Sequence, residues 1–198
     1  EIGFLIMARG AGSIISLVFI SRMGDKFEPR TLMTLGLMGT AAGTWMMSQW
    51  TPDVRGIDVF VANFVMGLAV GSVWAPMNKL ALARLPKKVQ DQGFAVFYLV
   101  FDMGYAIGTA LIIALFTRHS QVGHALFAEH VSPFNRALQD NDTVRGGWDI
   151  SAIEGLNMID NEVTRQAVAV AFNNCYMVLT IVLLSIIPIL LFFKNRPA

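Results

Sequence analysis

The chain has 198 residues, of which 55% are hydrophobic and 15% charged, and its mean hydropathy is +0.55. Soluble domains carry about 25% charged residues, so this balance indicates an integral membrane protein. The net charge of +1 says nothing about nucleic acid, and no basic cluster suggests a nucleic-acid partner. The single cysteine, Cys175, has no disulfide partner within the chain, and we expect it to be a small packing residue.

Five apolar stretches are long enough to cross a bilayer, which takes about 20 helical residues. They cover residues 2–20, 32–50, 58–78, 93–117 and 167–193. The first begins at once, without the charged region that opens a signal peptide, so we expect the chain to be part of a longer protein. The predicted fold class is an all-α integral membrane protein with five transmembrane helices.

The lysines predict the orientation of these helices. All five fall in the connectors 21–31 and 79–92 or in the C-terminal tail, which share one side of the membrane if the spans alternate: Lys26, Lys79, Lys87, Lys88 and Lys194. The positive-inside tendency makes that side, including the C-terminus, cytoplasmic. The long segment 118–166 contains no lysine and is predicted to be an extracytoplasmic loop with short helices, the last of which runs into the final span.

Three of the spans contain pairs of glycines four residues apart, a spacing that lets helix backbones approach closely. The pairs are Gly39 and Gly43, Gly67 and Gly71, and Gly104 and Gly108. They are consistent with generic packing of a bundle and also with surfaces on which helices slide, and the sequence leaves both interpretations open.

Two charged residues lie deep inside predicted spans, Arg9 and Asp102. A charge at the centre of a span costs about 2.5–3.5 kcal/mol on insertion scales. At 1.5 Å per residue, Asp102 lies roughly 14 Å and Arg9 roughly 16 Å from the cytoplasmic ends of their helices. Each belongs to a polar stripe on one helix face, Tyr98-Asp102-Tyr105-Thr109 and Arg9-Ser13-Ser16, and Asn63 begins a third polar or small face.

Two hypotheses explain these charges. Asp102 could be a proton-titrating carboxylate that lines a central cavity, with Arg9, Tyr98, Tyr105 and Asn63 as further residues of a proton or substrate pathway. Alternatively, Asp102 and Arg9 could form a buried structural pair. Near the external end of the last span, Asn173, Asn174 and Tyr176 could line a substrate exit or anchor the helix at the membrane interface.

The first connector, SRMGDKFEPR, resembles the cytoplasmic signature loop of the major facilitator superfamily. Asp25, Lys26 and Arg30 match the signature, whereas Ser21 stands where glycine is usual and Glu28-Pro29 departs from the glycine before the last basic residue. The stretches GSVWAPMNKLALARLP, GYAIGTALIIALFTR and HALFAEHVSPFNRAL resemble, in order, parts of the fourteen-helix drug:proton antiporters of this superfamily. The chain is therefore similar to the last five helices of their C-terminal half.

The resemblance implies a multi-pass protein of the bacterial inner membrane that exports amphipathic organic compounds in exchange for protons. Its implied partners are the bilayer, a small-molecule substrate, the N-terminal half of the same transporter and a periplasmic adaptor that docks on residues 118–166, which could also act as a lid. The signature residues Asp25, Lys26 and Arg30 are expected to stabilise one conformational state.

Other functions are kept as alternatives. A solute importer of the same fold and a non-transporting scaffold subunit of a larger complex both fit the composition. An enzyme is not expected, because the sequence has no nucleophile–base constellation or phosphate loop, and no cofactor is expected. The spacing of His119, His124 and His130 does not place two ligands on one helix turn, so no metal site is expected either.

Overall fold

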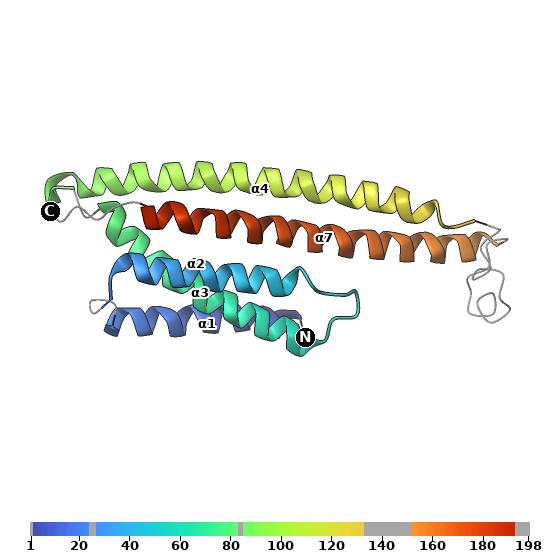
Figure 1. Cartoon of the computed structure of the whole chain (residues 1–198), viewed down its shortest axis with the longest axis horizontal. Helices are drawn as coiled ribbons and strands as arrows, with labels where there is room; N and C mark the ends of the chain where they lie inside the picture. The colour runs from blue at the N-terminus through green and yellow to red at the C-terminus, as the bar shows by residue number, and fades with distance from the viewer. Residues whose placement is uncertain (1, 24–26, 83–84, 133–151, 193–198) are drawn as a thin grey trace.

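The structure is a computed structural model, and it describes residues 2–23, 27–82, 85–132 and 152–192. These residues form five long α-helices and one short 3-10 helix, with no strand among them. In chain order they are α1 (Ile2–Met23), α2 (Pro29–Met47), α3 (Gly56–Leu82), η2 (Lys87–Val89), α4 (Gln90–Ala128) and α7 (Ile153–Phe192). Figure 1 shows the long helices side by side, with α4 and α7 as an antiparallel pair and α2 between α7 and the α1–α3 pair. The predicted all-α class is confirmed.

Three helical stretches in the described part of the chain are long and apolar enough to cross a membrane: Gly56–Ala81, Lys87–Ala128 and Ile153–Leu190. They correspond to the last three predicted spans. The first two predicted spans coincide with α1 and α2, of 22 and 19 residues. At 1.5 Å per residue, α2 is about 28 Å long, close to the roughly 30 Å of a hydrocarbon core. That all five helices cross the bilayer stays a prediction.

Helices α1 and α3 pack backbone against backbone. A Cβ atom added at Gly67 would overlap the carbonyl oxygen of Arg9, and one added at Gly71 would lie 2.7 Å from the Cβ of Ser16. Residues with a side chain do not allow so close an approach. The hydroxyls of Ser16 and Ser72 lie 2.8 Å apart across the same contact and share a hydrogen bond. Small residues therefore determine how these two helices meet.

Helix α2 joins α3 to α7. On one side, a Cβ added at Gly43 would lie 2.5 Å from Cγ of Met66 on α3. On the other side, the buried hydroxyls of Thr44 and Thr180 share a hydrogen bond of 2.8 Å between α2 and α7. Hydroxyl groups without a hydrogen-bond partner would be costly in lipid, so this hydrogen bond holds the two helices together.

Helix α4 packs mainly against α7. The rings of Phe116 and Phe172 lie 4.7 Å apart across this contact. Helix α4 also meets α3, where Trp74 packs edge-on against Phe101 with ring centroids 5.0 Å apart. Much of α4 is nevertheless exposed, including the large apolar side chains of its middle turns.

The last two helices are longer than the predicted spans. Helix α4 continues beyond residue 117 to Ala128, and α7 begins at Ile153 rather than at 167. Of the short helices expected within residues 118–166, the first is a continuation of α4 as far as Ala128. Residues 153–166 run unbroken into the final span. Residues 133–151 lie outside the described part of the chain.

The extension exists because α4 and α7 keep contacting each other there. A Cβ at the buried Gly123 would lie 3.5 Å from the Cβ of Ala167, an ordinary van der Waals contact between the two helices. His124 Nε2 lies 3.1 Å from a carboxylate oxygen of Asp160 on the facing helix. Ile159 is buried in the same region. In Figure 1 this part of the pair projects beyond the ends of α1, α2 and α3.

Candidate functional site

The polar stripe predicted on α4 is open. Tyr98, Asp102, Tyr105 and Thr109 are all exposed, in a helix whose most apolar window is not buried at all. Among the described residues, Asp102 has no hydrogen-bonding or ion-pairing partner. An unneutralised carboxylate in an apolar helix costs several kcal/mol in a bilayer. The stripe is exposed, and its role in a proton or substrate pathway stays a prediction.

The stripe predicted on α1 has a mixed role. The Ser13 hydroxyl donates to the carbonyl oxygen of Gly67 in α3 at 3.2 Å. The Ser16 hydroxyl shares a hydrogen bond with the hydroxyl of Ser72, which is also in α3. Both serines therefore tie α1 to α3 and do not line a cavity. The side chain of Arg9 is exposed.

Arg9 and Asp102 form no ion pair in the described part of the chain. Both side chains are exposed, so the hypothesis of a buried structural pair is not supported. Their similar depth did not bring them together, because α1 packs on α3 whereas α4 packs on α7. The pathway roles of Arg9 and Asp102 stay predictions.

The other predicted pathway residues lie in three places. Asn63 is half-buried and donates to the Val59 carbonyl oxygen of its own helix at 2.9 Å. The Tyr98 hydroxyl lies 3.5 Å from Oδ1 of Asn78 and so joins the small α3–α4 contact. Tyr105 borders an apolar groove between α4 and α7. Tyr98 and Tyr105 share the exposed α4 stripe with Asp102, whereas Asn63 bonds within α3.

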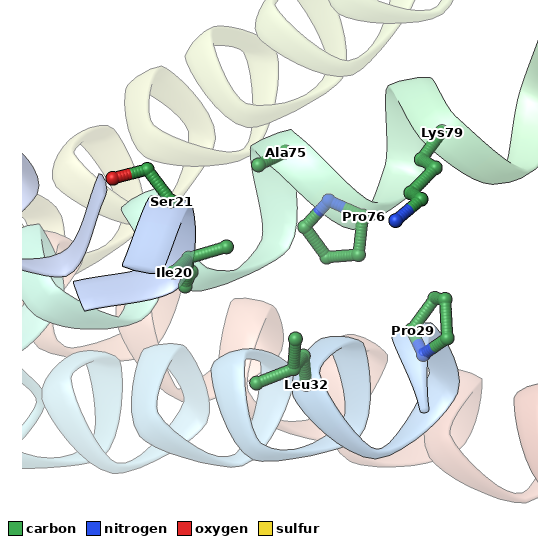
Figure 2. Close-up of a pocket in the computed structure, with 7 residues that line it drawn as sticks. All are labelled: Ile20, Ser21, Pro29, Leu32, Ala75, Pro76 and Lys79. Carbon is green, nitrogen blue, oxygen red and sulfur yellow. The ribbon is translucent and has the colours of Figure 1, made fainter. Parts of the chain in front are cut away.

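The signature segment lies at the end of the molecule where α1 is joined to α2. Asp25 and Lys26 are outside the described residues, whereas Arg30 is half-buried in the first turn of α2. Beside it, a cavity of about 160 Å³ lies between α1, α2 and α3. Figure 2 shows Pro76 in α3 facing Leu32 and Pro29 of α2 across this space, with the Lys79 side chain extending toward Pro29.

The opposite end of the molecule contains hydrogen bonds and ion pairs that the sequence did not predict. The Asn173 side-chain amide in α7 donates to the carbonyl oxygen of Trp50 at 2.7 Å. Arg165 in α7 lies 3.3 Å from Asp53 and 2.8 Å from Glu162. Together they connect α7 to the segment between α2 and α3. The charge patterns did not predict the contacts between the two segments, because Arg165 and Asp53 are 112 residues apart and Asn173 and Trp50 are 123 residues apart.

One further ion pair lies in this segment. Arg55 donates to both carboxylate oxygens of Asp58, at 3.0 and 3.3 Å. The hydrogen bond and the negative charge of Asp58 raise the pKa of Arg55. The pair lies at the start of α3. Because both groups are at the surface, it adds little to the stability of the fold.

Long apolar helices, joined at close glycine contacts and carrying an unpaired carboxylate, define a polytopic α-helical membrane protein. The chain belongs to the Major Facilitator Superfamily, whose sequence profile matches residues 1–128. The fatty acid resistance protein FarB of Neisseria gonorrhoeae is 24% identical over 86% of this chain and 34% of its own length. The multidrug export protein EmrB of Haemophilus influenzae is 22% identical over 93% of this chain and 36% of its own length.

A third relative, the probable multidrug resistance protein EmrY of Escherichia coli, is 22% identical over 90% of this chain and 35% of its own length. The chain thus spans about a third of the length of these curated relatives. No solved structure matches it significantly.

Proposed function

We propose that the transporter containing this chain exports amphipathic organic compounds across the bacterial inner membrane in exchange for protons. Membership of the superfamily and similarity to proteins named for fatty acid and multidrug resistance support this function. Fatty acids and drugs share an apolar body with a polar head, so amphipathicity is the common property of the proposed substrates. Alternating access, in which one helix bundle rocks against another, is the mechanism of such carriers.

The observation that carries the proposal is the unpaired Asp102 within α4. The charged carboxylate is costly in the membrane, and proton binding removes the charge. Among the described residues, no cationic side chain neutralises the Asp102 carboxylate. In this scheme Asp102 carries the proton, and Arg9, Tyr98, Tyr105 and Asn63 contribute to the polar path.

The proposal includes an orientation and two partners. The lysine-rich connectors and the C-terminus are cytoplasmic, so the projecting part of the α4–α7 pair reaches the periplasm. A periplasmic adaptor would dock on this projection, whose helices extend beyond the rest of the bundle. The N-terminal half of the transporter would face the exposed side of α4 and complete the central cavity. The signature residues Asp25, Lys26 and Arg30 would stabilise one of the two alternating conformations.

Efflux of a fluorescent dye tests this function and separates it from the alternatives. Cells that express the full transporter are loaded with ethidium, an amphipathic cation, and then energised. We expect faster dye loss than in cells with the empty vector, and a protonophore should abolish the difference. Faster uptake in the expressing cells would indicate an importer. If expressing cells and empty-vector cells lose ethidium at the same rate, and also lose a fluorescent fatty acid at the same rate, the scaffold would be favoured.

A further inference from the structure

A second pocket lies away from the α4 stripe, where the end of α2 and the segment after it meet α7. Its volume is about 270 Å³, just below the roughly 300–1,000 Å³ of most small-molecule sites. Three aromatic residues line it, Trp50 from the α2 side and Phe172 and Tyr176 from α7. The rings of Phe172 and Tyr176 lie 6.4 Å apart and are nearly parallel, with 21° between their planes. The pocket thus offers flat apolar walls.

The walls are fixed by contacts on both sides. The Asn173 amide donates to the Trp50 carbonyl oxygen at 2.7 Å and so holds the segment after α2 against α7. Trp50 and Tyr176 also pack on the buried core of α2 and α3 formed by Met47, Ala62 and Met66. Because the walls are already in place, a ligand that binds this pocket does not have to order the protein, and its affinity is not reduced by that cost.

Three polar atoms at this pocket have no partner among the described residues. They are the amide oxygen of Asn173, the hydroxyl of Tyr176 and the hydroxyl of Thr51. The Asn173 oxygen accepts hydrogen bonds, whereas the two hydroxyls both donate and accept. A ligand with one hydroxyl or amine group would satisfy them, as the few polar groups of an apolar pocket usually do.

The charges around the pocket favour an uncharged ligand. No acidic or basic side chain lines it. Asp53, on the segment after α2, is paired with Arg165.

We propose that this pocket is a binding site for small uncharged amphipathic molecules that consist of one or two aromatic rings and a hydrogen-bond donor. The ring lies between Trp50 and the aromatic face of α7, and the donor reaches the Asn173 amide oxygen or the Tyr176 hydroxyl. The site lies apart from Asp102 and is a place of equilibrium binding, so it does not depend on proton-coupled transport.

Quenching of tryptophan fluorescence tests the site with 4-bromophenol, because bromine quenches an indole that it contacts. The full transporter is placed in nanodiscs without any proton gradient. We expect a saturable quenching component that disappears in Trp50→Phe. Tyr176→Phe removes one hydroxyl and should weaken binding about three- to tenfold, the worth of one neutral hydrogen bond. Bromobenzene, which lacks the donor, should bind more weakly than 4-bromophenol by a similar factor.

Two matched controls locate the effect. Ala169→Phe places a ring in the pocket and should abolish the saturable component, whereas Val170→Phe, on the neighbouring exposed position, should not. Melting curves establish which variants are folded, and if Ala169→Phe is unfolded, Tyr176→Phe decides the question. Quenching that rises linearly with concentration, or is the same in folded Ala169→Phe or Tyr176→Phe, would show partitioning into lipid and overturn the proposal.

Discussion

The contact between α1 and α3 predicts that two similar glycine substitutions have opposite effects. In Gly67→Ala the new Cβ would overlap the carbonyl oxygen of Arg9, so the two helices must move apart. In Gly104→Ala nothing lies within 4 Å of the new Cβ. Both substitutions replace a glycine inside a helix with the best helix-forming residue, so the comparison isolates the steric contact.

The magnitude follows from two terms. Overfilling a packed contact costs about 1–3 kcal/mol, and replacing glycine by alanine in a helix contributes about 0.5–1 kcal/mol of stability. Gly104→Ala should therefore be neutral or slightly stabilising, and Gly67→Ala should be less stable than Gly104→Ala by about 1–3 kcal/mol. For a chain of this size, each kcal/mol corresponds to about 2–4 °C in melting temperature.

Thermal melting of the detergent-solubilised chain, followed by the loss of the monodisperse peak in size-exclusion chromatography, measures this difference. We expect Gly67→Ala to melt several degrees below Gly104→Ala. Equal melting temperatures, or a higher one for Gly67→Ala, would refute the close backbone contact between α1 and α3.

Three further predictions concern the orientation, a buried contact and the signature segment. In a Cys175→Ser background, an impermeant thiol reagent should label a cysteine at position 129 but not at 87 in cells with a permeabilised outer membrane; the reverse pattern would invert the proposed topology. In a double-mutant cycle of Thr44→Val and Thr180→Val, the coupling free energy should be about 0.5–1.5 kcal/mol, and additive effects would contradict the 2.8 Å hydrogen bond. Asp25→Asn should lower the maximal transport rate and leave KM within about threefold, whereas a large rise in KM at a normal rate would place Asp25 in substrate binding.

The sequence predicted the helices well because apolar length and composition determine where membrane helices form. It did not predict that α4 continues to Ala128, where the contact at Gly123 and the His124–Asp160 pair lie beyond the apolar core. It did predict a helix that runs into the final span. These contacts join residues that are distant in the chain. The hydrophobic and polar pattern of a single segment therefore does not predict these contacts.

The glycine pairs show a similar limit. Gly67 and Gly71 are in tight contact with α1, whereas Gly104 and Gly108 face open space, although both pairs have the same spacing. The polar stripes differ in the same way, because Ser13 and Ser16 bond α3 while the α4 stripe is exposed. Spacing determines which residues share a helix face, but the neighbouring helix decides what that face does.

The most direct test of the account is transport by Asp102→Asn in proteoliposomes that contain the full transporter. With a proton gradient imposed, we expect the variant to lose gradient-driven accumulation of a transported compound. Exchange of labelled for unlabelled compound without a gradient should continue, because that half-reaction does not require net proton movement. Gradient-driven accumulation at the normal rate in a folded Asp102→Asn protein would contradict the role of Asp102 as the proton-carrying carboxylate.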